Sequence, residues 1–208
     1  IYNSLMAIQI NGNGTITGIS VGGLPNGIVD TDMLAANAVS AAKLASGVGG
    51  KVLQVVQATK TDGDSQSVGS GNYWQPTAPK CSITPSNASN KILVQATVVA
   101  GLSTNAHGMY LTVLKDGNYI FRGDQDGSNM QRMTTGTYSH NDYNFGHLNF
   151  NYLDTAGGTS AIEYSLELRH DSGGTSTIYL NRTEATDNSD DRKRGATSII
   201  LMEIAAWQ

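Results

Sequence analysis

Cysteine and charged residues are scarce in this sequence, and both shortages exclude classes of protein. Cys81 is the only cysteine in 208 residues, so the chain can form neither an internal disulfide nor a thiolate metal site. Charged residues make up 14% of the chain, and 13 basic against 17 acidic residues leave a net charge of −4. A nucleic-acid partner would require a basic surface. The one basic run, 192–194, stands among aspartates, so we expect no nucleic-acid partner.

Long apolar runs and paired metal ligands are absent as well. No apolar run approaches the roughly 18 residues that a membrane-spanning helix requires, and no signal peptide is visible. The four histidines are scattered, with none paired at a metal-ligand spacing. The turn at 124–128 lacks the third ligand and the later glutamate of a calcium-binding loop. We therefore expect no membrane insertion, no metal, no cofactor, and synthesis in a reducing cytoplasm.

No catalytic motif in the sequence is complete. Gly63-Asp64-Ser65 is similar to the nucleophile block of one esterase family, but no histidine is preceded at three residues by the aspartate that this block requires. A glycan-degrading enzyme would need two carboxylates about 5 to 10 Å apart, for which Asp142 with Asp154 or Glu163 are the candidates. We expect a protein that is not an enzyme, and glycan hydrolysis stands as a third hypothesis.

Glycine and small polar residues are abundant, and apolar residues alternate with them in short segments. The 24 glycines exceed average usage, and Asp116-Gly117 is a hairpin signal. Strand-type patterns cover residues 52–59, 92–99, 109–114, 119–121, 148–152, 162–169, 178–180 and 200–206. Because no helix pattern follows Gly50, they predict a mainly β head over 51–208, an antiparallel, jelly-roll-like β-sandwich.

Two further predictions concern the surface of this head. Within 162–169, apolar residues alternate with polar ones, which predicts a strand with one face in water. Residues 122–145 and 181–197 show little strand pattern and indicate long loops, which are commonly functional. Aromatic faces beside hydrogen-bonding groups in the first loop suit a sugar ring, and ordinary loop packing is the alternative. This candidate glycan-contact loop consists of Tyr138, His140, Asn141, Asp142 and Tyr143.

Residues 28–47 contain a ten-residue repeat, present twice. Each copy begins with a helix-capping residue and ends with a residue type typical of a helix C-terminus. Each predicts about two turns of helix, which are marginal alone in water, so the apolar stripe needs a partner. We expect identical chains to associate through this connector, 28–50, with a low-complexity linker as the alternative. The predicted contacts are Val29, Leu34, Val39 and Leu44.

Residues 1–27 alternate apolar residues with Asn-Gly turns. Such short β-type pieces bury little in a single chain, so we expect an extended attachment arm that is ordered on a partner or within an oligomer. A disordered terminus is the alternative. Met6 has the form of a translation start, and we expect Ile1–Leu5 to be upstream or added sequence. The apolar residues of the arm are Ile8, Ile10, Ile16, Ile19 and Val21.

Three segments resemble bacteriophage tail-fibre and related virion surface proteins, especially those of marine and cyanobacterial phages. They are 11–25 (NGNGTITGISVGGLP), 29–56, where the repeat runs into Gly49-Gly50-Lys51, and 202–206 (MEIAA). The resemblance implies a homotrimer on the virion surface, made in the cytoplasm of a host bacterium. It also implies attachment through the N-terminal part and a distal β-rich head. Residues 62–191 carry no matching motif, so the ligand does not follow from the resemblance.

The resemblance leaves two functions open. The first is a tail fibre or spike whose head attaches the particle to glycans of the host surface. The alternative is a capsid cement or decoration protein, whose arm lies across capsomer seams; the short chain, without a long shaft, keeps this alternative open. In both, the partners are copies of the chain and other virion proteins.

Overall fold

The computed structural model describes residues 51–127, 131–139, 144–184 and 193–206, the strands β1 (Gln9–Ile10) and β2 (Ile16–Thr17), and Val39. The chain divides into two compact units, Ile1–Gly49 and Gly50–Gln208. The described residues form strands and turns, and they include no helix that could cross a membrane.

In the first unit, β1 and β2 pair antiparallel, with Ile10 opposite Ile16. Two of the three Asn-Gly pairs of the arm, Asn11-Gly12 and Asn13-Gly14, lie between these strands in the sequence. Ile8, Ile19 and Val21 of the predicted arm lie outside the described residues, as do Val29, Leu34 and Leu44 of the predicted connector. Val39 is exposed. The helical repeat, the arm and the trimer therefore stay predictions.

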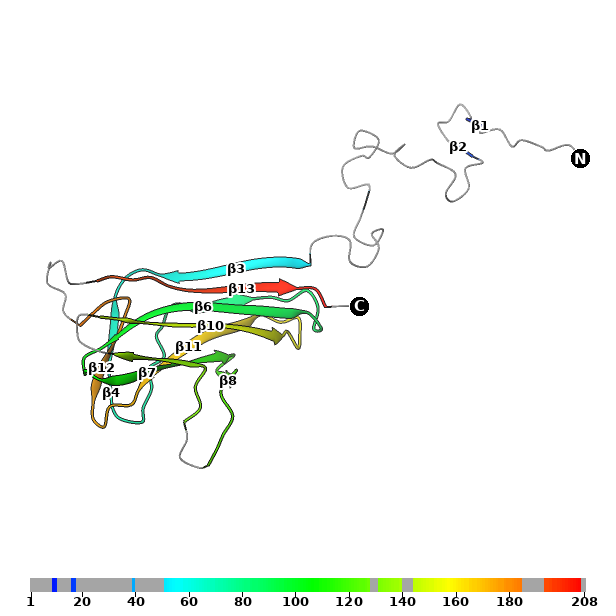
Figure 1. Cartoon of the computed structure of the whole chain (residues 1–208). Coiled ribbons are helices and arrows are strands. Elements are labelled where there is room, and N and C mark those ends of the chain that lie inside the picture. Colours follow the sequence, from blue (N-terminus) through cyan, green and yellow to red (C-terminus); the bar gives the residue numbers. More distant parts are fainter. Residues whose placement is uncertain are drawn as a thin grey trace, which may run out of the picture. The chain divides into compact units, whose positions relative to one another are not determined.

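The second unit, called the head below, is built from strands alone in its described part. All pairings are antiparallel and form two sheets that pack face to face (Figure 1). One sheet has the order β3-β13-β6-β12-β4, with β10 on the other edge of β6; the other has the order β5-β11-β7-β8, with β9 also pairing with β7. The strands are β3 (Val52–Lys60), β4 (Asp64–Val68), β5 (Cys81–Ile83), β6 (Lys91–Leu102), β7 (His107–Lys115), β8 (Asn118–Ile120), β9 (Thr135–Ser139), β10 (Gly146–Thr155), β11 (Ile162–His170), β12 (Ser176–Leu180) and β13 (Thr197–Ile204).

The predicted antiparallel sandwich is thus confirmed, and alternation explains its core. In β6, Ile92, Val94, Ala96 and Val98 are buried, while Leu93, Gln95 and Thr97 alternate with them on the outer face of the sheet. The predicted Asp116-Gly117 hairpin joins β7 to β8. Both turn residues have positive φ, 48° and 77°, as a type I′ turn requires.

The structure corrects the prediction that β11 has one face in water. Ile162, Tyr164, Leu166 and Leu168 face the core as expected, but Ser165 and Glu167 on the other face are buried too. The reason is tertiary: Tyr119 and Arg169 make hydrogen bonds to the Glu167 carboxylate and cover it. The alternation of apolar and polar residues indicates a strand, but it does not show whether other segments cover the polar face of that strand.

The predicted loop 122–145 is also wrong in part, because β9 lies within it. β9 pairs with β7 from His107 opposite Ser139 to Leu111 opposite Thr135. Its sequence, Thr-Gly-Thr-Tyr-Ser, has no apolar alternation, so the pairing and not the pattern identifies it. The strands β4 and β5 were not predicted either, because β4 is polar apart from Val68 and β5 has only three residues.

Candidate functional site

The predicted glycan-contact loop is described at only one of its five residues. Tyr138 lies on β9 opposite Gly108 of β7, with about half of its surface exposed. The other four, His140, Asn141, Asp142 and Tyr143, lie outside the described residues. The sugar-binding role of this loop therefore stays a prediction.

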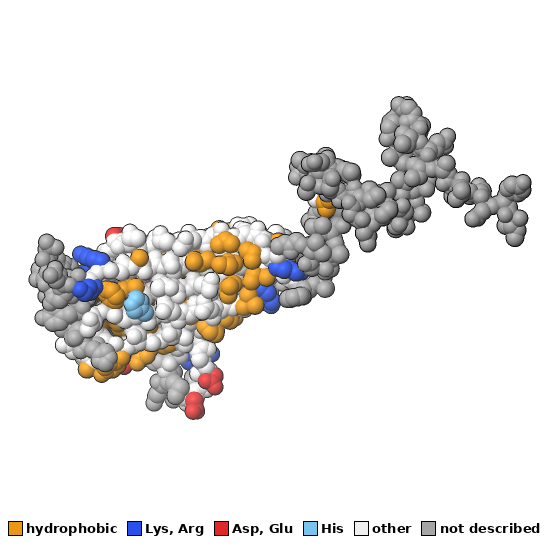
Figure 2. All heavy atoms as spheres, turned by 45° about the horizontal axis from the view of Figure 1, so that its top comes forward, with side chains coloured by type: hydrophobic (Ala, Val, Ile, Leu, Met, Phe, Trp, Pro, Cys, Tyr) orange, Lys and Arg blue, Asp and Glu red, His pale blue; other side chains and the backbone are white. Residues whose placement is uncertain are grey.

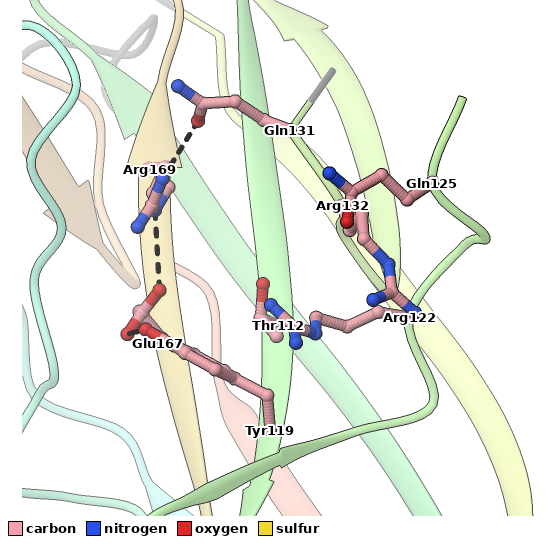
Figure 3. A pocket seen from close by; sticks show the side chains of 8 residues that line it. All are labelled: Thr112, Tyr119, Arg122, Gln125, Gln131, Arg132, Glu167 and Arg169. Carbon is pink, nitrogen blue, oxygen red and sulfur yellow. Dashed lines mark hydrogen bonds and ion pairs between the residues drawn. The ribbon is translucent and has the colours of Figure 1, made fainter. Parts of the chain in front are cut away.

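A polar pocket of about 270 Å³ lies on the outer face of the five-stranded sheet. Strands β7, β8 and β11 contribute to it, together with residues 121–127 and 131–134, which lie between β8 and β9. Figure 3 shows Arg122, Gln125 and Arg132 projecting from these residues, and Glu167 and Arg169 from β11. We call this the arginine pocket; its lining residues are Thr112, Tyr119, Arg122, Gln125, Gln131, Arg132, Glu167 and Arg169.

The floor of the arginine pocket is a buried carboxylate with its partners. Glu167 stands opposite Thr112 in the β11–β7 pairing and is 1% exposed. One carboxylate oxygen accepts from Nε of Arg169 at 3.3 Å, and the other from the Tyr119 hydroxyl at 2.8 Å. Burial and this hydrogen bond raise the pKa of Tyr119, so its hydroxyl stays a donor at neutral pH.

Hydrogen bonds and one aromatic contact hold the wall of the pocket in place. The amide of Gly123 donates to the carbonyl of Met133 at 3.1 Å, and Nε of Arg132 donates to the carbonyl of Gly123 at 2.6 Å. Phe121, with a positive φ of 46°, stacks on Tyr152 with the ring centroids 4.6 Å apart. These contacts tie the backbone beside Arg122 to the backbone beside Arg132, so both arginines project from residues that are held by neighbours.

The pocket carries an excess of positive charge. Three arginines and one glutamate line it, which leaves a net charge of +2. Arg169 is paired with Glu167 and also donates to Gln131 at 2.8 Å. In the described part of the chain, no carboxylate lies within ion-pair distance of Arg122 or Arg132. The Arg122 guanidinium instead lies 4.3 Å from the centroid of the Tyr119 ring.

A second hollow of about 390 Å³ adjoins the first at Gln131. Asp171 lines it and accepts from the Gly108 amide at 2.7 Å and from the Tyr110 hydroxyl at 2.9 Å. Burial alone would raise the pKa of Asp171, but these hydrogen bonds and that of His107 outweigh it and lower the pKa. The site is an anchored carboxylate at the start of the 171–175 turn.

The head also contains a buried histidine–serine pair beside this hollow. Nδ1 of His170 lies 2.8 Å from Oγ of Ser172, and Nε2 lies 2.8 Å from the carbonyl of Val68. Ser172 is only 3% exposed. A nucleophilic serine has to meet its substrate, and this one is enclosed, so the pair ties the 171–175 turn to β4.

The carboxylates considered for glycan hydrolysis are engaged elsewhere. Asp154 accepts from the Tyr164 hydroxyl at 2.7 Å and pairs with Nζ of Lys115 at 2.8 Å. Glu163 pairs with Nζ of Lys80 at 3.0 Å. Asp142 lies outside the described residues. Among the residues that are described, no cluster of three or more possible metal ligands occurs.

An apolar row crosses the outer face of the six-stranded sheet. Val55 of β3, Met202 of β13, Leu93 of β6 and Leu153 of β10 stand opposite one another in register. The outermost two, Val55 and Leu153, are 55% and 52% exposed. Figure 2 shows hydrophobic side chains gathered toward the end of the head where β3 begins. We call these four residues the apolar row.

The row next to it is polar but uncharged. Gln57 and Gln95 lie on either side of Ile200, Asn151 stands opposite Gln95, and Nε2 of Gln95 donates to Oδ1 of Asn151 at 2.8 Å. This row itself carries no charge that would repel a second copy. The sequence indicates apolar residues on the outer face, because Ile200, Leu201 and Met202 follow one another and successive residues of a strand point to opposite faces.

Comparison with known proteins shows no family. No family model matches the chain, and no curated protein matches it. Solved structures of the infectious bursal disease virus show a weak structural similarity to this chain. The Gt strain structure matches with 15% identity and a TM-score of 0.40, over 74% of this chain and 38% of that one. The VP2 subviral particle matches with 14% identity and a TM-score of 0.38, again over 74% and 38%. This chain thus spans about two fifths of those chains, and a likeness of this size carries no argument about its function.

Proposed function

We propose that the chain is a homotrimeric surface protein of a bacteriophage particle, a tail fibre or spike. Its N-terminal arm attaches it to the particle, and its head binds glycans of the host surface without acting as an enzyme. The resemblance of segments 11–25, 29–56 and 202–206 supports the virion location. The observation that carries the adhesive role is the arginine pocket, a concave polar site on a head that is otherwise poor in charge.

Adhesion of this kind depends on several binding sites acting together. A pocket of about 270 Å³ makes a limited set of contacts, so a single site is expected to bind weakly. Joining copies through the connector predicted for residues 28–50 raises the effective concentration of the second and third sites. Weak contacts thereby add up to firm attachment of a particle.

The test uses the full chain with host cells and with glycans isolated from their envelope. We expect saturable binding that is lost when both Arg122 and Arg132 are replaced by glutamine. Absence of binding at millimolar glycan, with intact folding, would contradict the adhesive role.

The alternative is a capsid cement or decoration protein, and the apolar row favours it. A flat apolar strip on a sheet face suits burial against a neighbouring shell protein as well as against a second copy. Copy number separates the two functions. A number close to that of the shell protein, with loss of heat resistance when the chain is removed, would indicate cement; a few copies on the tail would indicate a fibre.

A further inference from the structure

We infer that the arginine pocket binds the acidic group of a saccharide, a carboxylate or a sulfate carried on a sugar ring. The inference rests on the proposed function and names the ligand class of the same site. It follows from the charge of the pocket, from its neutral hydrogen-bonding groups and from its size.

The charge of the pocket calls for an anion. Arg169 already has the Glu167 carboxylate as its partner, whereas no described carboxylate pairs with Arg122 or Arg132. A guanidinium presents a planar fork of donors that matches the two oxygens of a carboxylate or sulfate. Arg132 uses Nε for the Gly123 carbonyl, which orients the group and leaves its terminal nitrogens for a ligand.

The neutral groups of the pocket suit the rest of a sugar. Gln125 and Gln131 line the wall, and Thr112 brings a hydroxyl to the floor. The Thr112 hydroxyl donates to the sulfur of Met133, so its oxygen can still accept a hydrogen bond from a ligand hydroxyl. Amides and hydroxyls both donate and accept, as ring hydroxyls require.

The size and the rim of the pocket limit the ligand further. Its volume of about 270 Å³ lies just below the range of ligand pockets for drug-sized molecules, roughly 300 to 1,000 Å³. Asp124 and Asp126 are exposed on the segment that carries Arg122. Their negative charges, with the net charge of −4, disfavour a long uniform polyanion and favour one acidic sugar unit.

The experiment measures binding by calorimetry with the full chain and four probes. The probes are a trigalacturonate, a sulfated galactan oligosaccharide, a neutral galactan oligosaccharide and inorganic sulfate. We expect an acidic oligosaccharide to bind, and Arg122→Gln or Arg132→Gln to weaken it about tenfold each, as loss of a charged hydrogen-bond pair predicts. Arg194→Gln removes the same charge outside the pocket and should leave binding unchanged.

Thermal unfolding of each variant shows whether it folds, and Arg122→Lys provides a second variant that keeps the charge but loses the fork. Equal binding of the neutral oligosaccharide would overturn the inference and leave the proposed function standing. Acidic binding that survives both arginine substitutions would overturn the inference and show that adhesion uses a site other than the arginine pocket. Inorganic sulfate binding as tightly as the sulfated sugar would overturn the saccharide part. Failure to bind any saccharide or any host cell would overturn the proposed function itself.

Discussion

Glu203 shows how a single buried carboxylate joins separate segments of the head. It is 1% exposed, and one of its oxygens accepts from the Ser86 amide at 2.7 Å and from Nδ2 of Asn90 at 2.6 Å. The other accepts from Nε2 of Gln54 on β3 at 2.6 Å. Burial alone would raise the pKa of Glu203, but these hydrogen bonds outweigh it and lower the pKa from 4.5 to about 2.

The lowered pKa predicts an acid-dependent loss of stability. A carboxyl group with a folded pKa of about 2 and an ordinary value of 4.5 stabilises the head above pH 4.5. That contribution disappears as the pH falls from 4.5 through 2. We expect Glu203→Gln to lower the free energy of unfolding by about 2 to 3 kcal/mol at neutral pH. Near pH 2, the free energies of unfolding of the variant and the wild type should become similar.

Urea unfolding at several pH values measures this difference. Glu163→Gln is the control, because the Lys80–Glu163 pair is exposed and such pairs contribute little. A difference between wild type and Glu203→Gln that does not shrink on acidification would show that the carboxylate is not held in its charged form.

Tyr164 carries a second buried polar contact. Its ring is fully buried, and its hydroxyl donates to Asp154, which also pairs with Lys115. Burial and the Asp154 carboxylate raise the pKa of Tyr164 well above its ordinary value. Tyr164→Phe removes the donor and keeps the ring, so we expect a loss of about 1 to 2 kcal/mol in the free energy of unfolding by urea. An unchanged midpoint would mean that the hydroxyl contributes nothing.

At the scale of elements, β13 is the strand on which the larger sheet depends. It pairs with β3 on one side and with β6 on the other, and it buries Ile199 and Leu201 while Ile200 and Met202 face outward. We expect Leu201→Ala to cost about 2 to 5 kcal/mol of unfolding free energy. The neighbouring Ile200→Ala, on the outward face of the same strand but outside the apolar row, should cost less than about 1 kcal/mol. Equal losses in denaturant titrations would show that the assigned faces of β13 are wrong.

Strands were predictable from the sequence where their side chains repeat with a clear period. The apolar runs of β3 and β6, the alternation of β11 and the Asp116-Gly117 turn all correspond to observed elements. Strands β4, β5 and β9 were not predictable. A short or polar strand has no clear apolar period, and it forms where a neighbouring strand supplies hydrogen bonds.

The arginine pocket could not be predicted from the sequence, for a different reason. Thr112, Arg122, Arg132 and Glu167 are spread over more than fifty positions of the sequence, and no spacing marks them as a group. They meet because the β7–β11 pairing sets Thr112 against Glu167 and because Phe121 directs the following segment over that pair. Such a site depends on register and tertiary packing, neither of which a local motif reports.

At the scale of the whole molecule, we expect the apolar row to contact a second copy of the chain. Its outermost members, Val55 and Leu153, are 55% and 52% exposed. Contact with a second copy would remove their apolar surface from water.

Val55→Lys tests this contact. A charge placed in an apolar interface costs several kcal/mol, so we expect the oligomer to dissociate at protein concentrations at which wild type stays assembled. Thr59→Lys is the matched control, since Thr59 lies on the same strand and the same face but outside the apolar row. Equal dissociation curves for both variants in sedimentation velocity would show that the row is not an interface.

Multivalent adhesion and burial of the apolar row both require copies of this chain to associate. The molar mass of the full chain in solution, measured by light scattering, tests this most directly. Three times the chain mass of 21.9 kDa is the predicted result. A mass of 21.9 kDa at every accessible concentration would contradict it.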